Sequence, residues 1–515
     1  MKDAYITIFN ACKAINDYIL DKEKSDDLDF VDHYMFQATS YVISIIYDDI
    51  ILKSKSYCKI FIYRSLIECV SVINMYMAGD INEEVKELIN KYCYLAEFGI
   101  YKKYKDDLDG KQFIFDQIED NFKETKNIYR DNYDDINNSE FKDKIRSQLP
   151  FIKDDYSFDS LVQKYCSEFY QYYRIFSVMI HPNDILKSSK LINDLDFSTL
   201  ELRLFKPILD AITKYYGDCE LPKSKTFNET KRDVSSDPLN LEYSKYVLEQ
   251  EQACCDIANM VYDVYGNNQV SLFFRELGYC ISSMAIDRIF DYPEVVKCKF
   301  KMSIEMAATF YYASLLSHTK EEQYLGELIS KHTRIKIYEI LGEDTKELWD
   351  DAYKCYLKSG SSITFDEFKK HFSLPLGFIP EKTNITNFVY KLIDAVCGED
   401  KTFAAHMRMV YDESQLLSHA NGYMITANTG AFMEFSSVIV FMDSVIDTLM
   451  YLYWKINGMA DIVNGTNNKR FVYRINQYRK KFVKAAKSKA AIDKVLNTLT
   501  MQFANSSNYE YFKKQ

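Results

Sequence analysis

Apolar residues along this 515-residue chain recur mostly at the three- and four-residue spacing of one helix face, and not at the alternating spacing of a strand. Little interrupts this pattern, because the chain holds only 8 prolines and 15 glycines. The sequence therefore predicts an all-α fold. Helices are expected over 1–25, 30–54, 56–79, 80–104 and 158–181, followed by one or two more up to about residue 217.

Two stretches depart from the helical pattern. Residues 105–157 are rich in Asp, Lys and Asn and have only patchy apolar spacing, which indicates an exposed, partly helical insert. Residues 218–240 have no apolar face and are interrupted by prolines, so they are predicted to be a linker.

The chain on one side of this linker resembles the chain on the other side at an almost constant distance. Arg64 and Glu68 recur 237 residues later as Lys301 and Glu305, while Tyr173 and His181 recur 238 residues later as Tyr411 and His419. A constant offset across separate helices predicts the duplication of one large unit rather than a solenoid. The expected organisation is a helical-bundle domain at 1–217, the linker at 218–240, a second such domain at 241–457 related by a pseudo-twofold axis, and a basic helical tail at 458–515.

The net charge of −11 hides a strong asymmetry between the tail and the remainder of the chain. From residue 469 onward, twelve Lys and Arg face two acidic residues. Such a tail is suited to bind nucleic acid, to dock on its own acidic body or on an acidic partner, or simply to form a solvated basic helix. The candidate nucleic-acid-binding residues are Lys469, Arg470, Arg474, Arg479, Lys480, Lys481 and Lys484.

The sequence favours a cytoplasmic protein without a membrane span, a metal site or a cofactor. The most apolar stretch, from Phe432 to Trp454, is interrupted by Glu434, Asp443 and Asp447, which favours a buried helix. The first residues have no apolar core of signal-peptide length. Twelve cysteines without a Cys-x-x-Cys pair indicate reduced thiols rather than disulfides or a zinc framework. Neither His-Glu-x-x-His nor a phosphate-binding glycine loop occurs.

Each predicted unit offers a basic residue, a glutamate one turn later and a histidine from a distant helix. The sets are Arg64, Glu68 and His181 in the first unit, with Ser177 and Arg174 one and two turns before the histidine, and Lys301, Glu305 and His419 in the second. His181 is expected at the C-terminal end of its helix, where the negative end of the helix dipole favours the protonated form. A purely structural interpretation stands beside the chemical one. Arg64 and Glu68 can pair along one helix, and a buried Arg–Glu–His cluster can fix how two helices dock.

The spacing Arg174-x6-His181 resembles the Arg-x4-6-His signature of the HEPN superfamily, whose helical bundles are common in bacterial anti-phage and toxin systems. The Arg/Lys-x3-Glu and Ser-x3-His patterns also resemble a bacterial helical family of abortive-infection type. In HEPN proteins the arginine and histidine of two domains usually meet at a dimer interface and cleave RNA without a metal. Histidine suits proton transfer near neutral pH, and arginine suits the charge on phosphate.

This resemblance implies a metal-independent ribonuclease of a defence or toxin–antitoxin system, with RNA as its partner. A protein partner or antitoxin and a homo-oligomer are also consistent with it. The implied catalytic residues are Arg174, His181 and His419, and the implied supporting residues are Arg64, Glu68, Ser177, Lys301 and Glu305.

The second unit departs from the family pattern. Asp412 stands where the second arginine would be, and Arg408, one turn earlier, is predicted to pair with it. Ile175 also replaces the polar residue that usually follows the arginine. The alternative function is therefore a non-catalytic helical sensor or scaffold that binds a protein or a nucleic acid.

Overall fold

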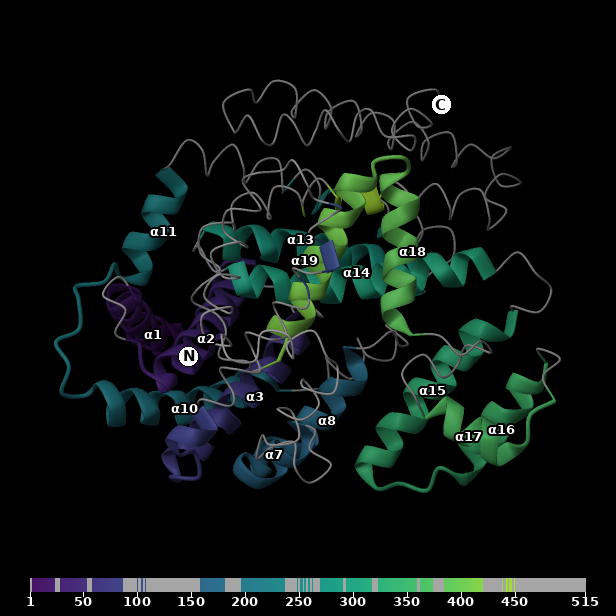
Figure 1. The fold of residues 1–515 in the computed structure, drawn as a ribbon, viewed down its shortest axis with the longest axis horizontal. Coiled ribbons are helices and arrows are strands. Elements are labelled where there is room, and N and C mark those ends of the chain that lie inside the picture. The colour runs from purple at the N-terminus through teal and green to yellow at the C-terminus, as the bar shows by residue number, and fades with distance from the viewer. Residues whose placement is uncertain are drawn as a thin grey trace, which may run out of the picture.

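The computed structural model describes residues 2–23, 28–52, 58–86, 158–180, 196–236, 269–289, 293–316, 323–358, 362–373 and 384–419, together with scattered positions between 100 and 107, 248 and 262, and 438 and 449. Within these residues 86% of the chain is helical and no strand occurs, which confirms the all-α prediction (Figure 1). His181, nearly all of the predicted insert and the basic tail lie outside the described residues.

The first half of the chain is organised around α3 (Cys58–Met77). The helices α2 (Phe30–Tyr47), α7 (Phe158–Tyr165), α8 (Tyr170–Met179) and α10 (Phe197–Tyr216) all pack against it, and α1 (Lys2–Glu23) packs against α2 and α10. A π-helical turn, Asp48–Leu52, continues α2. Because α3 is apolar on nearly all sides, it is buried as a central helix.

The corresponding central helix of the second half is α14 (Pro293–Leu316). It packs against α13 (Gln269–Ile289), α18 (Ile385–Cys397) and α19 (Lys401–Leu417). It also packs against α2 and α3, so the two central helices are in contact. The helices α15 (Gln323–Leu341), α16 (Lys346–Leu357) and α17 (Phe365–Phe372) lie at the lower right of Figure 1, and α15 packs against α8.

The helix α3 is long and apolar enough, from Lys59 to Met77, to cross a membrane by length and composition. However, 83% of its apolar window is buried inside the protein. Its apolar surface is therefore used for packing against neighbouring helices.

The stretch that was expected to be a linker contains the helix α11 (Phe227–Ser236), which packs against α1. Phe227 anchors it, since this side chain is 2% exposed and its ring meets that of Phe9 edge-on at a centroid distance of 5.1 Å. The backbone N–H of Phe227 also donates to Asn10 Oδ1 at 2.9 Å. The packing of α11 thus depends on one buried aromatic residue, and a search for a repeating apolar face does not detect such a helix.

The single helix predicted over 158–181 is in fact two helices. The helix α7 ends at Tyr165, Cys166 leaves the helical conformation with φ −140° and ψ 40°, and α8 begins at Tyr170. Asn74 on α3 compensates for the break, because its side-chain amide donates to the Tyr165 carbonyl at 2.9 Å. The end of α8 at Met179 agrees with the predicted end of the helix before Pro182.

Candidate functional site

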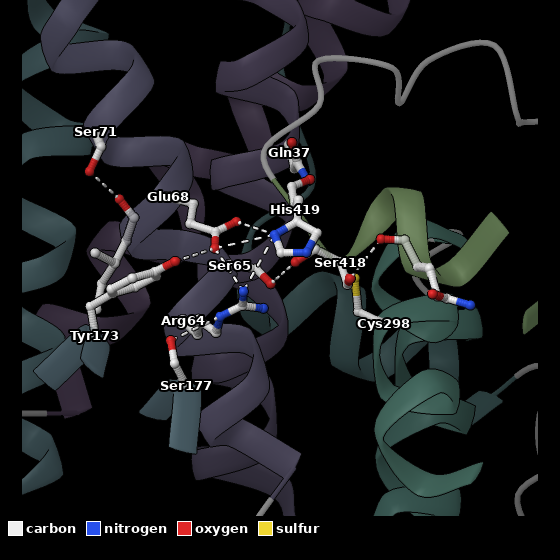
Figure 2. Close-up of polar contacts among 12 residues, drawn as sticks. Gln37, Arg64, Ser65, Glu68, Ser71, Tyr173, Ser177, Cys298, Ser418 and His419 are labelled. Carbon is white, nitrogen blue, oxygen red and sulfur yellow. Dashed lines mark hydrogen bonds and ion pairs between the residues drawn. The ribbon is translucent and has the colours of Figure 1, made fainter. Parts of the chain in front are cut away.

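The candidate site is centred on His419, which follows α19 and reaches the first half of the chain (Figure 2). Its Nδ1 lies 3.1 Å from Glu68 Oε2, and Glu68 is completely buried on α3. The backbone at this end of α19 is held as well. Ser65 Oγ donates to the carbonyl of Ser418 at 2.8 Å, and Gln37 Nε2 donates to the carbonyl of His419 at 3.4 Å. About a third of the His419 side chain, 34%, stays exposed.

Side chains of α3 and α8 surround the carboxylate of Glu68. Arg64 Nη2 lies 3.2 Å from Glu68 Oε1 and 3.4 Å from His419 Nδ1. The Nε of Arg64 donates to Ser177 Oγ at 3.2 Å, and the hydroxyl of Tyr173 donates to Glu68 Oε1 at 3.0 Å. The structure thus brings together Arg64, Glu68, Ser177 and His419, four of the residues that the sequence singled out.

The charges indicate a neutral imidazole on an ionised carboxylate. Burial raises the pKa of Glu68, but the charge of Arg64 together with the interactions with His419 and Tyr173 outweighs this effect and leaves the pKa below its usual value. Burial lowers the pKa of His419, Arg64 adds to that effect, and Glu68 only partly opposes it. The helix-dipole expectation concerns His181, which lies outside the described residues; at His419 burial lowers the pKa instead.

The partner of Nδ1 sets the tautomer of the imidazole. An ionised Glu68 can only accept hydrogen bonds and Arg64 can only donate, and Glu68 is the closer of the two to Nδ1. We therefore assign the proton to Nδ1, which leaves the lone pair on Nε2. Among the described residues, nothing forms a hydrogen bond to Nε2. A partly exposed histidine in this state can accept a proton from a bound molecule.

The matching residues of the second half form a similar pair with different electrostatics. Tyr411 donates to Glu305 Oε1 at 3.0 Å, the same contact as that of Tyr173 with Glu68. Lys301 Nζ, however, lies 4.0 Å from Glu305 Oε1 and donates to Ser418 Oγ at 3.0 Å. Burial raises the pKa of Glu305 and lowers that of Lys301, so this pair lacks the firmly ionised carboxylate of the first half. No described histidine contacts Glu305.

Phe158, at the start of α7, was not singled out by the sequence. Its ring lies nearly parallel to the imidazole of His419, with a centroid distance of 5.2 Å and an interplanar angle of 8°. Arg174, predicted to be catalytic, lies instead over the ring of Tyr170 at 5.7 Å, and it has no hydrogen bond or ion pair with a described residue. The cation beside His419 is thus Arg64. No regular spacing relates Phe158 to His419, so no sequence signal could have found their contact.

The predicted pairing of Arg408 with Asp412 is wrong. Arg408 pairs across the helix packing with Asp394 of α18. Asp412 instead accepts from Tyr390 at 2.7 Å and from Lys103 at 2.7 Å. Arg408 and Asp412 reach Asp394 and Tyr390 because α18 and α19 pack side by side. The negative charge of Asp412 is therefore compensated by Lys103.

Within the part of the chain that the structure describes, no group of three or more His, Cys, Asp or Glu side chains is placed to hold a metal ion. Comparison with models of known protein families, with curated proteins and with solved structures gives no match. The case for a function therefore rests on the site itself and on the short sequence resemblance.

Proposed function

We propose that this chain is a HEPN-like effector of a bacterial defence or toxin–antitoxin system that cleaves RNA by acid–base catalysis without a metal. The observation that carries the proposal is the 34% exposed imidazole of His419, held through Nδ1 by the buried carboxylate of Glu68. In this arrangement Glu68 orients the ring, and Nε2 exchanges a proton with the ribose 2′-hydroxyl or with the leaving oxygen.

The origin of the contacting groups supports the same proposal. The histidine comes from the second half of the chain, and the arginine and glutamate that contact it come from the first half. This agrees with the HEPN resemblance, because in HEPN proteins two domains usually form one site together. The arginine that contacts His419 is Arg64 and not Arg174. Because Arg64 is 7% exposed and already bonded to Glu68 and Ser177, its role is to hold the dyad rather than to grip phosphate.

We also propose that the two halves arose by internal duplication. Supporting this, Tyr173 contacts Glu68 and Tyr411 contacts Glu305 at the same distance, 3.0 Å, on helices at matching places in the sequence. In this proposal α3 corresponds to α14 and α8 corresponds to α19. The test is a superposition of the two halves, and it fails if Glu68 and Glu305 then occupy unrelated positions.

The catalytic proposal is tested with the full chain and a labelled RNA in buffer containing a chelator. The wild type is expected to cleave, while His419→Ala and Glu68→Gln lower kcat/KM by about 100-fold or more, the usual contribution of acid–base catalysis. His371→Ala on α17 removes a histidine remote from the site and serves as the matched control. His181→Ala tests the second sequence-predicted histidine in the same assay.

A second candidate function, a non-catalytic scaffold or sensor, is favoured by a specific observation. Arg64, Glu68, Lys301 and Glu305 are all at least nine-tenths buried where α3 meets α14, as in clusters that fix helix docking. In this case the wild type leaves RNA intact under all conditions, and His419→Ala lowers the melting temperature. That pair of results would refute the nuclease proposal and leave the scaffold.

A further inference from the structure

A substrate phosphate needs a cation, and the cation beside His419 is buried and engaged. The partly exposed side chains around the site supply another. Phe158 lies against the His419 ring, and the next residue, Asp159, accepts from the hydroxyl of Tyr170 at 2.6 Å. The guanidinium of Arg174 lies over the Tyr170 ring at 5.7 Å. These contacts form a continuous path from the imidazole to Arg174.

The helix geometry places Arg174 on the side of α8 that faces the site. Arg174 and Ser177 are three residues apart, so they share one helix face, and Ser177 accepts from Arg64. Phe158, Tyr170 and Arg174 are each partly exposed. No described acidic side chain pairs with Arg174, because the nearby carboxylate of Asp159 is bonded to Tyr170. An aromatic side chain and a stacked arginine without an acidic partner thus lie next to the proposed catalytic histidine.

We propose that Phe158, Tyr170 and Arg174 form a binding strip for single-stranded nucleic acid that leads to His419. The proposal rests on the proposed function for the class of ligand. Aromatic rings stack with bases of any sequence, and a guanidinium without an acidic partner binds phosphate. The bases of a duplex are hidden in its stack, so the strip selects single strands.

The strip also separates binding from cleavage. Stacking and phosphate contacts do not require a ribose 2′-hydroxyl, whereas the proposed chemistry at His419 does. Single-stranded DNA should therefore bind without being cut and should compete with RNA. This gives a stable ligand with which binding to the wild-type chain can be measured.

The test measures fluorescence anisotropy of a labelled, mixed-sequence single-stranded DNA with the full chain. Tyr170→Ala is expected to raise Kd by about tenfold, which corresponds to roughly 1.4 kcal/mol of base stacking. Tyr170→Phe keeps the ring but releases the carboxylate of Asp159, so it should weaken binding clearly less than Tyr170→Ala does. Arg174→Ala is expected to weaken binding and to reduce the slope of log K against log salt by about 0.7, the value for one phosphate contact.

Arg203 provides a matched control. Its guanidinium lies over the Phe169 ring at 5.6 Å, almost as Arg174 lies over Tyr170, but it is paired with Glu168 at 3.1 Å. Arg203→Ala should leave Kd and the salt slope unchanged. Four results would each overturn the strip. They are equal effects of Arg203→Ala and Arg174→Ala on Kd, equal effects of Tyr170→Phe and Tyr170→Ala on Kd, equal binding of single-stranded and duplex DNA, and no binding by the wild type.

The two proposals fail in different ways. If single strands bind through the strip but RNA stays intact, the proposed ribonuclease activity is wrong and the strip stands. If RNA is cleaved in a His419-dependent way while Tyr170→Ala and Arg174→Ala change neither Kd nor KM, the strip is wrong and the activity stands. An effect of Arg174→Ala on kcat instead of KM would return Arg174 to the catalytic role that its sequence spacing suggested.

Discussion

Two buried glutamates in matching positions have pKa values that are shifted in opposite directions. Glu68 has its pKa lowered because a guanidinium lies 3.2 Å away and a histidine lies on its other side. Burial raises the pKa of Glu305, and its ammonium partner, Lys301, which lies 4.0 Å away and also donates to Ser418, only partly opposes this effect. The planar fork of arginine holds a carboxylate more firmly than the single charged point of lysine does. The site is therefore asymmetric even where the sequence repeats.

This difference predicts a ranking of two hydroxyl deletions. Tyr173→Phe removes a hydrogen bond to a carboxylate with a lowered pKa and should cost about 1.5–3 kcal/mol of unfolding free energy, while Tyr411→Phe removes one to a carboxyl group with a raised pKa and should cost less, about 0.5–1.5 kcal/mol. Urea denaturation of both variants measures the ranking. The reverse order, or no loss in Tyr173→Phe, would contradict the assigned charge states.

The lowered pKa of His419 predicts how stability depends on pH. The folded protein keeps this imidazole neutral, while the unfolded chain binds a proton below the ordinary pKa of about 6.5. This contribution is fully present above that pH and is lost as the pH falls toward the folded pKa. Glu68 acts with the same sign at lower pH, since its folded pKa lies below its ordinary value of 4.5. His419→Gln should therefore flatten the decline in stability just below pH 6.5.

Chemical denaturation at a series of pH values measures this slope for the wild type and for His419→Gln. His371→Gln, on α17, is the control and should keep the slope of the wild type. An unchanged slope in His419→Gln would show that another group titrates in this window.

Sequence reasoning identified most residues of the site but not how they combine. Arg64 and Glu68 stood out by their spacing and recurrence, and they do contact each other. The contact of Glu68 with His419, the histidine of the other half, could not be predicted. The offset matches His419 to His181, but it does not tell which half either histidine contacts. The stack with Phe158 is likewise set by tertiary packing alone.

At the scale of elements, the break between α7 and α8 positions the site. Phe169 and Phe176 are both fully buried, so apolar spacing continues through the break and a single helix is predicted. The break itself depends on a partner from another helix. Asn74 donates to the Tyr165 carbonyl, which has lost its helical partner. Periodicity along one segment carries no information about such a partner.

Asn74→Ala should therefore cost about 1–3 kcal/mol, because it leaves the carbonyl of Tyr165 without its donor in a partly buried place. It should also loosen α8, which carries Ser177 and Arg174, and so raise Kd for single-stranded DNA. Ser373→Ala removes an exposed side chain that bonds only within its own helix turn, and it should change little. Thermal melts and the anisotropy assay measure both effects, and a wild-type melting temperature for Asn74→Ala would argue against its role.

At the scale of the whole molecule, the second half contributes to the hydrophobic core of the first half. Residues of α13 and α14 belong to the hydrophobic cluster built mainly by the first half, among them Cys280, Val295, Cys298 and Met302. The sequence predicted two units with a linker, but it could not predict this contribution. A helix that is buried on nearly all sides, as α14 is, does not reveal which neighbours it contacts.

A buried ion pair between the two halves allows this contribution to be tested. Lys299 of α14 is fully buried, and its Nζ lies 3.1 Å from Oδ2 of Asp48, which follows α2 and is 2% exposed. Lys299→Ala leaves that carboxylate buried without its counter-charge, which typically costs about 3–5 kcal/mol.

Because the pair joins both halves, they should lose stability together. Hydrogen exchange should show the same increase in opening in α1 and in α18, which lie in different halves. Lys206→Ala, which removes an exposed i, i+4 pair with Asp210, should leave the stability almost unchanged. Faster exchange confined to one half would mean that the halves unfold independently, and that the site of His419 and Glu68 can open without global unfolding.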